Sequence, residues 1–67
     1  MATSTRKVNM TLTAYIISAV RRSSPGRKAV ATKRVRECGS RAALKANVTR
    51  SCTGSVRTKA HALIDNA

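Results

Sequence analysis

The apolar residues of the chain first recur at helical spacing from about Thr11. One face of that segment carries them at positions i, i+3, i+4, i+7 and i+8, namely Leu12, Tyr15, Ile16, Ala19 and Val20. Three residues near its start have N-cap side chains: Asn9, Thr11 and Thr13. Arg21 and Arg22 lie where cations favour a helix C-terminus, and Ser23-Ser24-Pro25-Gly26 follows as a break. We therefore predict a helix from about Thr11 to Arg22.

A second helix is predicted from about Arg27 to Cys38, with Gly39 as its C-cap. Its apolar stripe is narrow, because two cations share the sector of the three apolar residues: Arg27 and Arg34 beside Ala31, Val35 and Cys38. Such a helix can bury only a thin strip of its surface.

Two further helices are predicted in the second half of the chain. Ser40 caps the first, from Arg41 to about Arg50, which Thr53-Gly54 ends. We expect its inward side chains to be Ala43, Leu44 and Val48. The last helix follows Ser55 and carries apolar residues at i, i+4, i+7, i+8 and i+11: Val56, Ala60, Leu63, Ile64 and Ala67.

The region around Thr53-Gly54 also permits a β-hairpin. Residues 47–52 and 55–60 flank this turn, and Val48, Cys52 and Val56 could alternate along two strands, as in the wing of a winged helix. Ala and Lys are frequent there and favour helix. The predicted fold class is therefore all-α, a small bundle of three to four short helices that could include a helix-turn-helix, with the winged helix as the alternative.

The chain is short and its potential core is thin. Its 67 residues allow one domain at most, which we place at residues 11–67 behind a flexible basic arm at residues 1–10. Leu, Ile and Val together number twelve, and eleven of the other apolar residues are Ala. A low aliphatic share with high net charge is typical of chains that need a partner or self-association, such as a homodimer, to fold.

Charge gives the strongest functional signal. Fourteen Lys and Arg stand against two acids, Glu37 and Asp65, for a net charge of +12. So large an excess of positive charge indicates a polyanionic partner. When Lys and Arg side chains bind phosphates, the counterions held by the phosphates are released, which favours binding. No stretch approaches 18 apolar residues, so we expect no integral membrane association.

The cations concentrate in the middle of the chain, where eight of the fourteen fall between Arg21 and Arg41. Residues 28–49 have the proportions of a helix-turn-helix, whose second helix would offer Arg and Asn to bases. The predicted phosphate contacts are Arg21, Arg22, Arg27, Lys28, Lys33, Arg34 and Arg36, and the predicted base contacts are Arg41, Lys45 and Asn47.

The residues that could carry other chemistry are few and scattered. Cys38, Cys52 and His61 lack the spacing of metal ligands, and we interpret them as two packing thiols and a solvent-facing histidine. A Cys38–Cys52 bridge stays an alternative. The single histidine and the distant carboxylates argue against an enzyme, and no cofactor is expected. Thiols without a disulfide framework suit the cytoplasm, nucleoid or nucleus, ahead of an organellar matrix.

Three functions fit these observations. The first is a small nucleic-acid-binding protein, with DNA ahead of RNA as its target. The second is a structural component of a ribosome or another ribonucleoprotein. The third is a small regulator, of viral or mobile-element type, that docks on an acidic host protein such as a polymerase or a nucleoid factor.

Overall fold

The computed structural model describes the backbone of residues 2–67 and the side chains of residues 10–67. It contains four helices: α1 (Ala2–Arg22), α2 (Pro25–Cys38), α3 (Arg41–Ser51) and α4 (Gly54–Asn66). No strand occurs in this described part. The predicted all-α bundle is therefore confirmed.

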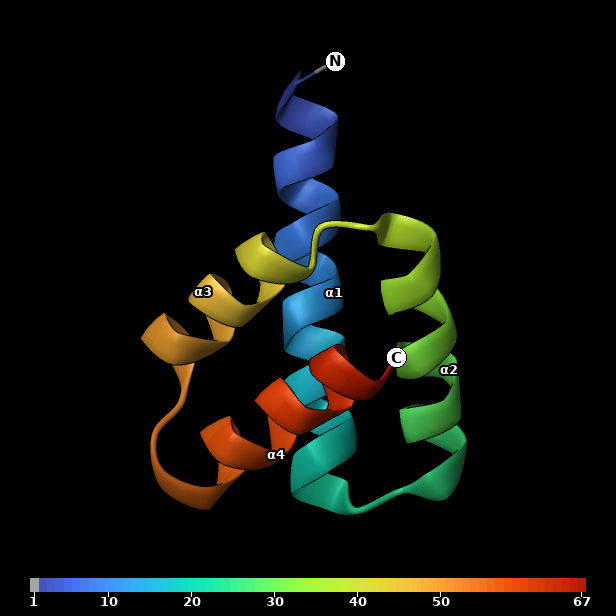
Figure 1. Ribbon diagram of the computed structural model, residues 1–67, viewed down its shortest axis with the longest axis vertical. Helices are drawn as coiled ribbons and strands as arrows, with labels where there is room; N and C mark the ends of the chain where they lie inside the picture. Colours follow the sequence, from blue (N-terminus) through green and yellow to red (C-terminus); the bar gives the residue numbers. More distant parts are fainter. Residues whose placement is uncertain (1) are drawn as a thin grey trace.

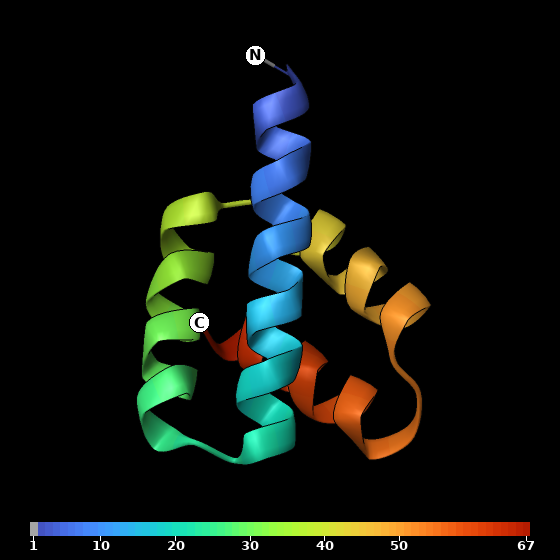
Figure 2. The ribbon, with the colours of Figure 1, turned by 180° about the vertical axis from the view of Figure 1, so that it is seen from behind.

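The four helices pack around α1 and α4. Helix α1 contacts each of the other three, and α2 returns beside it in the opposite direction (Figures 1 and 2). Helix α4 contacts α1, α2 and α3, whereas α2 and α3 barely contact each other. The bundle thus consists of an α1–α2 pair and an α3–α4 pair, which are held together mainly through α1 and α4.

The core contains at least two buried apolar side chains from each helix. Its fully buried members come from all four helices: Ile16, Ala19, Ala31, Val35, Leu44, Val48, Ala60 and Ile64. Leu12, Val20 and Cys52 are nearly as buried. The spacing in the sequence had placed these faces correctly, except that Ala43, expected to face inward, is exposed on α3.

Helix α1 begins well before its predicted start. It extends from Ala2, so the residues proposed as N-caps, Asn9, Thr11 and Thr13, lie inside the helix and not at its start. Thr13 is instead buried against the core side. The break at Ser23-Ser24-Pro25 was correctly placed. The predicted flexible arm, residues 1–10, falls almost entirely outside the described side chains and stays a prediction.

Helix α2 is delimited at both ends by specific residues. The hydroxyl of Ser24 accepts a hydrogen bond from the backbone N–H of Arg27, and Pro25 opens the helix where a missing N–H costs nothing. At the other end Gly39 adopts φ 70°, a left-handed conformation that glycine enters without strain. The helix therefore starts two residues earlier than predicted and ends where predicted.

The β-hairpin alternative is wrong. Residues 47–51 and 54–60 are helical, and the extended backbone is confined to the connection at Cys52-Thr53. Val48 lies within α3 and Cys52 follows its last residue, and both side chains are buried in the core of the helical bundle. No winged helix forms.

The turn predicted at Gly39 is present, and Gly39-Ser40 connects α2 to α3. These two helices barely contact each other, because each packs on α1 and α4 instead. The pair thus lacks the mutual packing that fixes a recognition helix in such a motif.

Candidate nucleic-acid interface

Positive charge dominates the described surface. Arg6 and Lys7 lie outside the described side chains, which leaves twelve of the fourteen cations to consider against Glu37 and Asp65. Within that part, one ion pair forms, between Lys45 and Asp65 at 2.9 Å. Most of the positive charge is therefore not neutralised by the protein itself.

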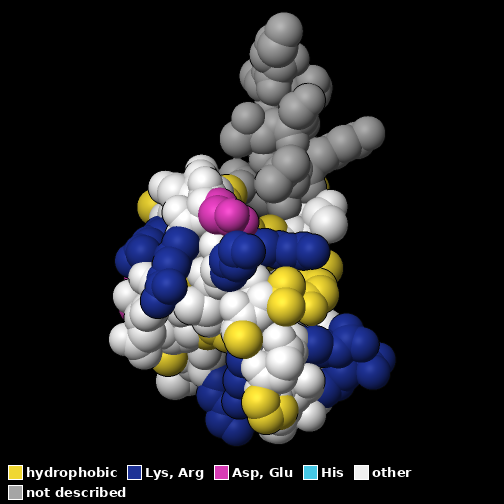
Figure 3. Space-filling model, turned by 90° about the vertical axis from the view of Figure 1, so that its right-hand side faces the viewer, with side chains coloured by type: hydrophobic (Ala, Val, Ile, Leu, Met, Phe, Trp, Pro, Cys, Tyr) yellow, Lys and Arg dark blue, Asp and Glu magenta, His cyan; other side chains and the backbone are white. Residues whose placement is uncertain are grey.

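The end of α1 and the length of α2 carry many exposed cations. All seven predicted phosphate contacts are exposed there: Arg21, Arg22, Arg27, Lys28, Lys33, Arg34 and Arg36. Figure 3, which views the molecule from the α2 side, shows Lys and Arg in several groups over this face, with one acidic patch beside the upper groups and hydrophobic side chains between the upper and lower ones. Arg22 ends α1 and Arg27 is in the first turn of α2, so these two residues flank the short α1–α2 connection. We call these seven residues the α1–α2 surface.

Tyr15 lies at the edge of this surface without offering a free ring face to it. The ring is half-buried against the core, and the guanidinium of Arg34 lies 5.1 Å from its centroid. A cation in that position is attracted by the π-electrons of the ring. The contact holds Arg34 in place and covers the one aromatic side chain on which a base could stack.

The predicted base contacts on α3 are engaged within the protein. Arg41 donates to the backbone oxygen of Ala67 at 2.5 Å. Lys45 donates to both carboxylate oxygens of Asp65, at 2.9 and 3.2 Å. Both contacts tie α3 to the end of α4, which leaves these two side chains less available than those of α2.

Asn47 is engaged in the same way. Its amide nitrogen donates to the hydroxyl of Thr13 on α1, at 3.5 Å, and its amide oxygen accepts from Arg50. Reading adenine requires both of these amide atoms. The structure thus gives Asn47 a role between α1 and α3, and its predicted base contact stays untested.

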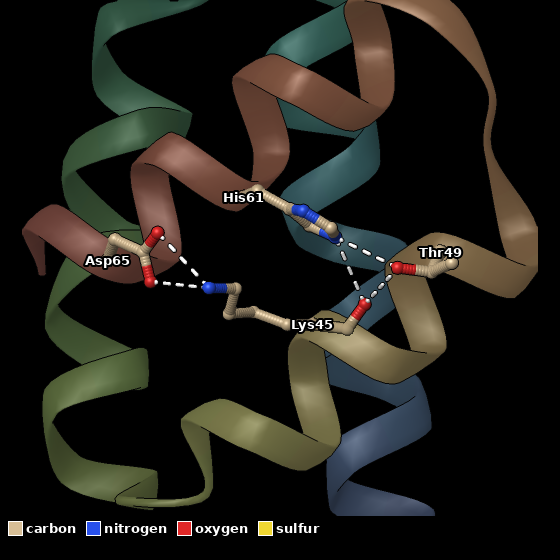
Figure 4. A network of polar contacts seen from close by, with 4 residues as sticks. All are labelled: Lys45, Thr49, His61 and Asp65. Atoms are coloured by element: carbon tan, nitrogen blue, oxygen red, sulfur yellow. Dashed lines mark hydrogen bonds and ion pairs between the residues drawn. The ribbon is translucent and has the colours of Figure 1, made fainter.

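His61 was expected to face solvent, and this is wrong. The ring is half-buried, with Nε2 at 3.1 Å from both the Thr49 hydroxyl and the Lys45 carbonyl oxygen (Figure 4). The Thr49 hydroxyl also donates to that carbonyl, at 2.9 Å. Together with Lys45 and Asp65, these contacts form a polar seam along the α3–α4 pair. The sequence did not indicate this role for His61, because hydrogen bonds between two helices leave no periodic pattern.

Three cations that the predicted interface did not include flank the connection between α3 and α4. Arg50 is in the last turn of α3, and Arg57 and Lys59 follow in α4. Arg50 and Lys59 are exposed and Arg57 is half-buried. These three residues are distant in sequence from the α1–α2 surface. Their position relative to that surface therefore depends on how the helices pack.

The remaining reactive side chains do not form a site. Cys38 is half-buried and Cys52 is buried, and the structure joins them by no disulfide. Among the described residues, no three of His, Cys, Asp or Glu gather where a metal ion could bind. Within the same part of the chain, no helix is long and apolar enough to cross a membrane. Comparison with protein-family models, with curated proteins and with solved structures finds no match to this chain.

Proposed function

We propose that this protein binds nucleic acid, with duplex DNA first, through contacts between the α1–α2 surface and phosphates. The observation that supports the proposal is the exposure of all seven cations of that surface, none of which forms an ion pair within the described residues. Seven cations beside a single carboxylate, Glu37, form a surface complementary to a dense row of phosphates.

Binding of this kind derives its free energy mainly from counterion release. Each phosphate neutralised by Lys or Arg frees condensed cations from the duplex, and the gain shrinks as salt concentration rises. Phosphate contacts position a protein and carry no sequence information. Since the α3 side chains suited to base contact are engaged internally, we expect weak sequence preference.

The test is the affinity of the full chain for a duplex of random sequence, measured across salt concentrations. If each of the seven cations neutralises one phosphate, the slope of log K against log salt is about −6. Parallel measurements on duplex RNA of the same sequence separate the two nucleic acids. An affinity that does not change between low and moderate salt would sink the proposal.

A pair of variants locates the contact. Arg22→Gln/Arg27→Gln removes two exposed cations of the α1–α2 surface, and we expect the slope to become shallower by about two. Arg41→Gln/Lys45→Gln removes the same charge from residues that are engaged internally, and we expect a smaller change. Equal effects of the two variants would mean that net charge alone, without a defined surface, governs binding.

A further inference from the structure

Two connections that are far apart in the sequence lie at the same end of the bundle. Figures 1 and 2 show the α1–α2 connection, at Ser23-Ser24, and the α3–α4 connection, at Cys52-Thr53, both at the end opposite the N-terminus. The α2–α3 connection, at Gly39-Ser40, lies nearer the N-terminal end in both views. In Figure 1 the first two connections occupy opposite sides of their shared end.

Each of these two connections is flanked by cations. The α1–α2 group consists of the last turn of α1 and the start of α2: Arg21, Arg22, Arg27 and Lys28. The α3–α4 group consists of Arg50, Arg57 and Lys59. The two groups are far apart in the sequence, and they lie at one end of the bundle only because of the fold.

The two acids of the chain lie away from this end. Glu37 is in the last turn of α2 and Asp65 is in the last turn of α4, where it pairs with Lys45. The first turns of α2 and α4 contain no acidic residue. The end with the two connections therefore carries seven of the twelve described cations, from both helix pairs, and neither of the two acids.

We propose that these two groups grip the two phosphate backbones of one nucleic-acid duplex, so that the end of the bundle spans a groove. This inference rests on the proposed function and specifies how the protein holds the duplex. The body of the protein measures 33 × 23 × 17 Å, and its width in the plane of Figure 1 is 23 Å. A major groove is about 12 Å wide, so the body of the protein is wide enough to extend across it from one backbone to the other.

The same surface is poorly suited to other partners. Protein interfaces depend on buried aromatic or apolar anchors. Among the described residues, the large hydrophobic side chains that are exposed are Met10 at 63% and Val30 at 40%, and neither is aromatic. Single strands are held by stacked aromatic rings, and Tyr15 is covered by Arg34. Two separate sets of cations match the two rigid backbones of a duplex.

The experiment compares the wild type with Arg50→Gln/Lys59→Gln, using a 16-base-pair duplex and the corresponding single strand. Loss of two phosphate contacts makes the salt slope on the duplex shallower by about two, so the fall in affinity between roughly 50 and 200 mM salt shrinks by about tenfold. We expect the wild type to prefer the duplex and the variant to lose part of that preference. Arg41→Gln/Lys45→Gln is the charge-matched control.

Circular dichroism of each variant shows whether the bundle is intact. Because Arg50 also contacts Asn47, Lys59→Gln alone provides a second variant with no such contact, and it should change the slope by about one. An unchanged duplex slope in both variants, or a wild type that prefers the single strand, overturns this inference while leaving phosphate binding intact. A wild type that binds neither nucleic acid but captures an acidic protein overturns the proposed function as well.

Discussion

At the scale of single residues, the hydrogen bonds around His61 determine where its ring carries a proton. The hydroxyl of Thr49 donates to the carbonyl oxygen of Lys45, so a lone pair of that hydroxyl is left to face Nε2. The carbonyl oxygen itself can only accept. Since Nε2 faces two acceptors, it must be the protonated nitrogen of the neutral ring, and nitrogen-detected NMR of His61 should show the Nε2–H tautomer.

Thr49 should therefore stabilise the fold more than an ordinary helical threonine. Thr49→Val keeps the shape of the side chain and removes the acceptor for His61, and we expect it to lower the free energy of unfolding by about 0.5–1 kcal/mol in urea titrations. Thr58→Val is the matched control, because its hydroxyl bonds only to the carbonyl of Gly54 in its own helix. Equal losses in the two variants would show that the His61 contact contributes nothing.

At the scale of elements, the helix ends differ in how much side-chain capping stabilises them. Ser24 and Ser40 both occupy N-cap positions, but only the Ser24 hydroxyl accepts a hydrogen bond from the helix it precedes. Pro25 and Gly39 complete a set of local signals around α2 that were visible in the sequence. Helix α2 is thus defined mainly by its ends, since Ala31 and Val35 are its buried residues.

The two serines provide a direct test of capping. Ser24→Ala should lower the free energy of unfolding by about 1 kcal/mol, because the N–H of Arg27 loses its acceptor. Ser40→Ala should cost clearly less, because no side-chain bond is lost at α3. Thermal and urea unfolding of both variants measure the difference. A larger loss at Ser40 would contradict this assignment of the caps.

At the scale of the whole molecule, the charge that favours binding opposes folding. A net charge of +12 is confined to a small body with one ion pair between its described residues, so its cations repel one another. Added salt screens this repulsion and also weakens phosphate binding. Stability and affinity should therefore respond to salt in opposite directions.

We expect the midpoint of thermal unfolding to rise by several degrees as sodium chloride increases from low concentration, where ~1 kcal/mol corresponds to about 4–8 °C for a domain of this size. Chloride is the appropriate anion, because sulfate strengthens apolar burial in addition to screening. A midpoint that falls or stays constant as chloride increases would show that self-repulsion does not limit this fold.

Much of the fold was predictable because it depends on local patterns. The spacing of Leu12, Ile16 and Val20 places the buried face of α1, and Gly39 ends α2. The early start of α1 was not predictable, since threonine and asparagine suit an N-cap as well as a helix surface. The position of the α1–α2 and α3–α4 connections at the same end depends on how the two helix pairs pack, which no short-range pattern encodes. The same applies to the contacts that engage Lys45.

The central position of α4 has a consequence for how the protein is made. This helix is the last of the four in the chain, yet it contacts all three others and buries Ala60 and Ile64 completely. As synthesis proceeds from the N-terminus, the apolar faces of α1, α2 and α3 emerge before the helix that covers them. We expect the nascent chain to remain open to proteases and chaperones until Ile64 has left the ribosome, and then to close in one step.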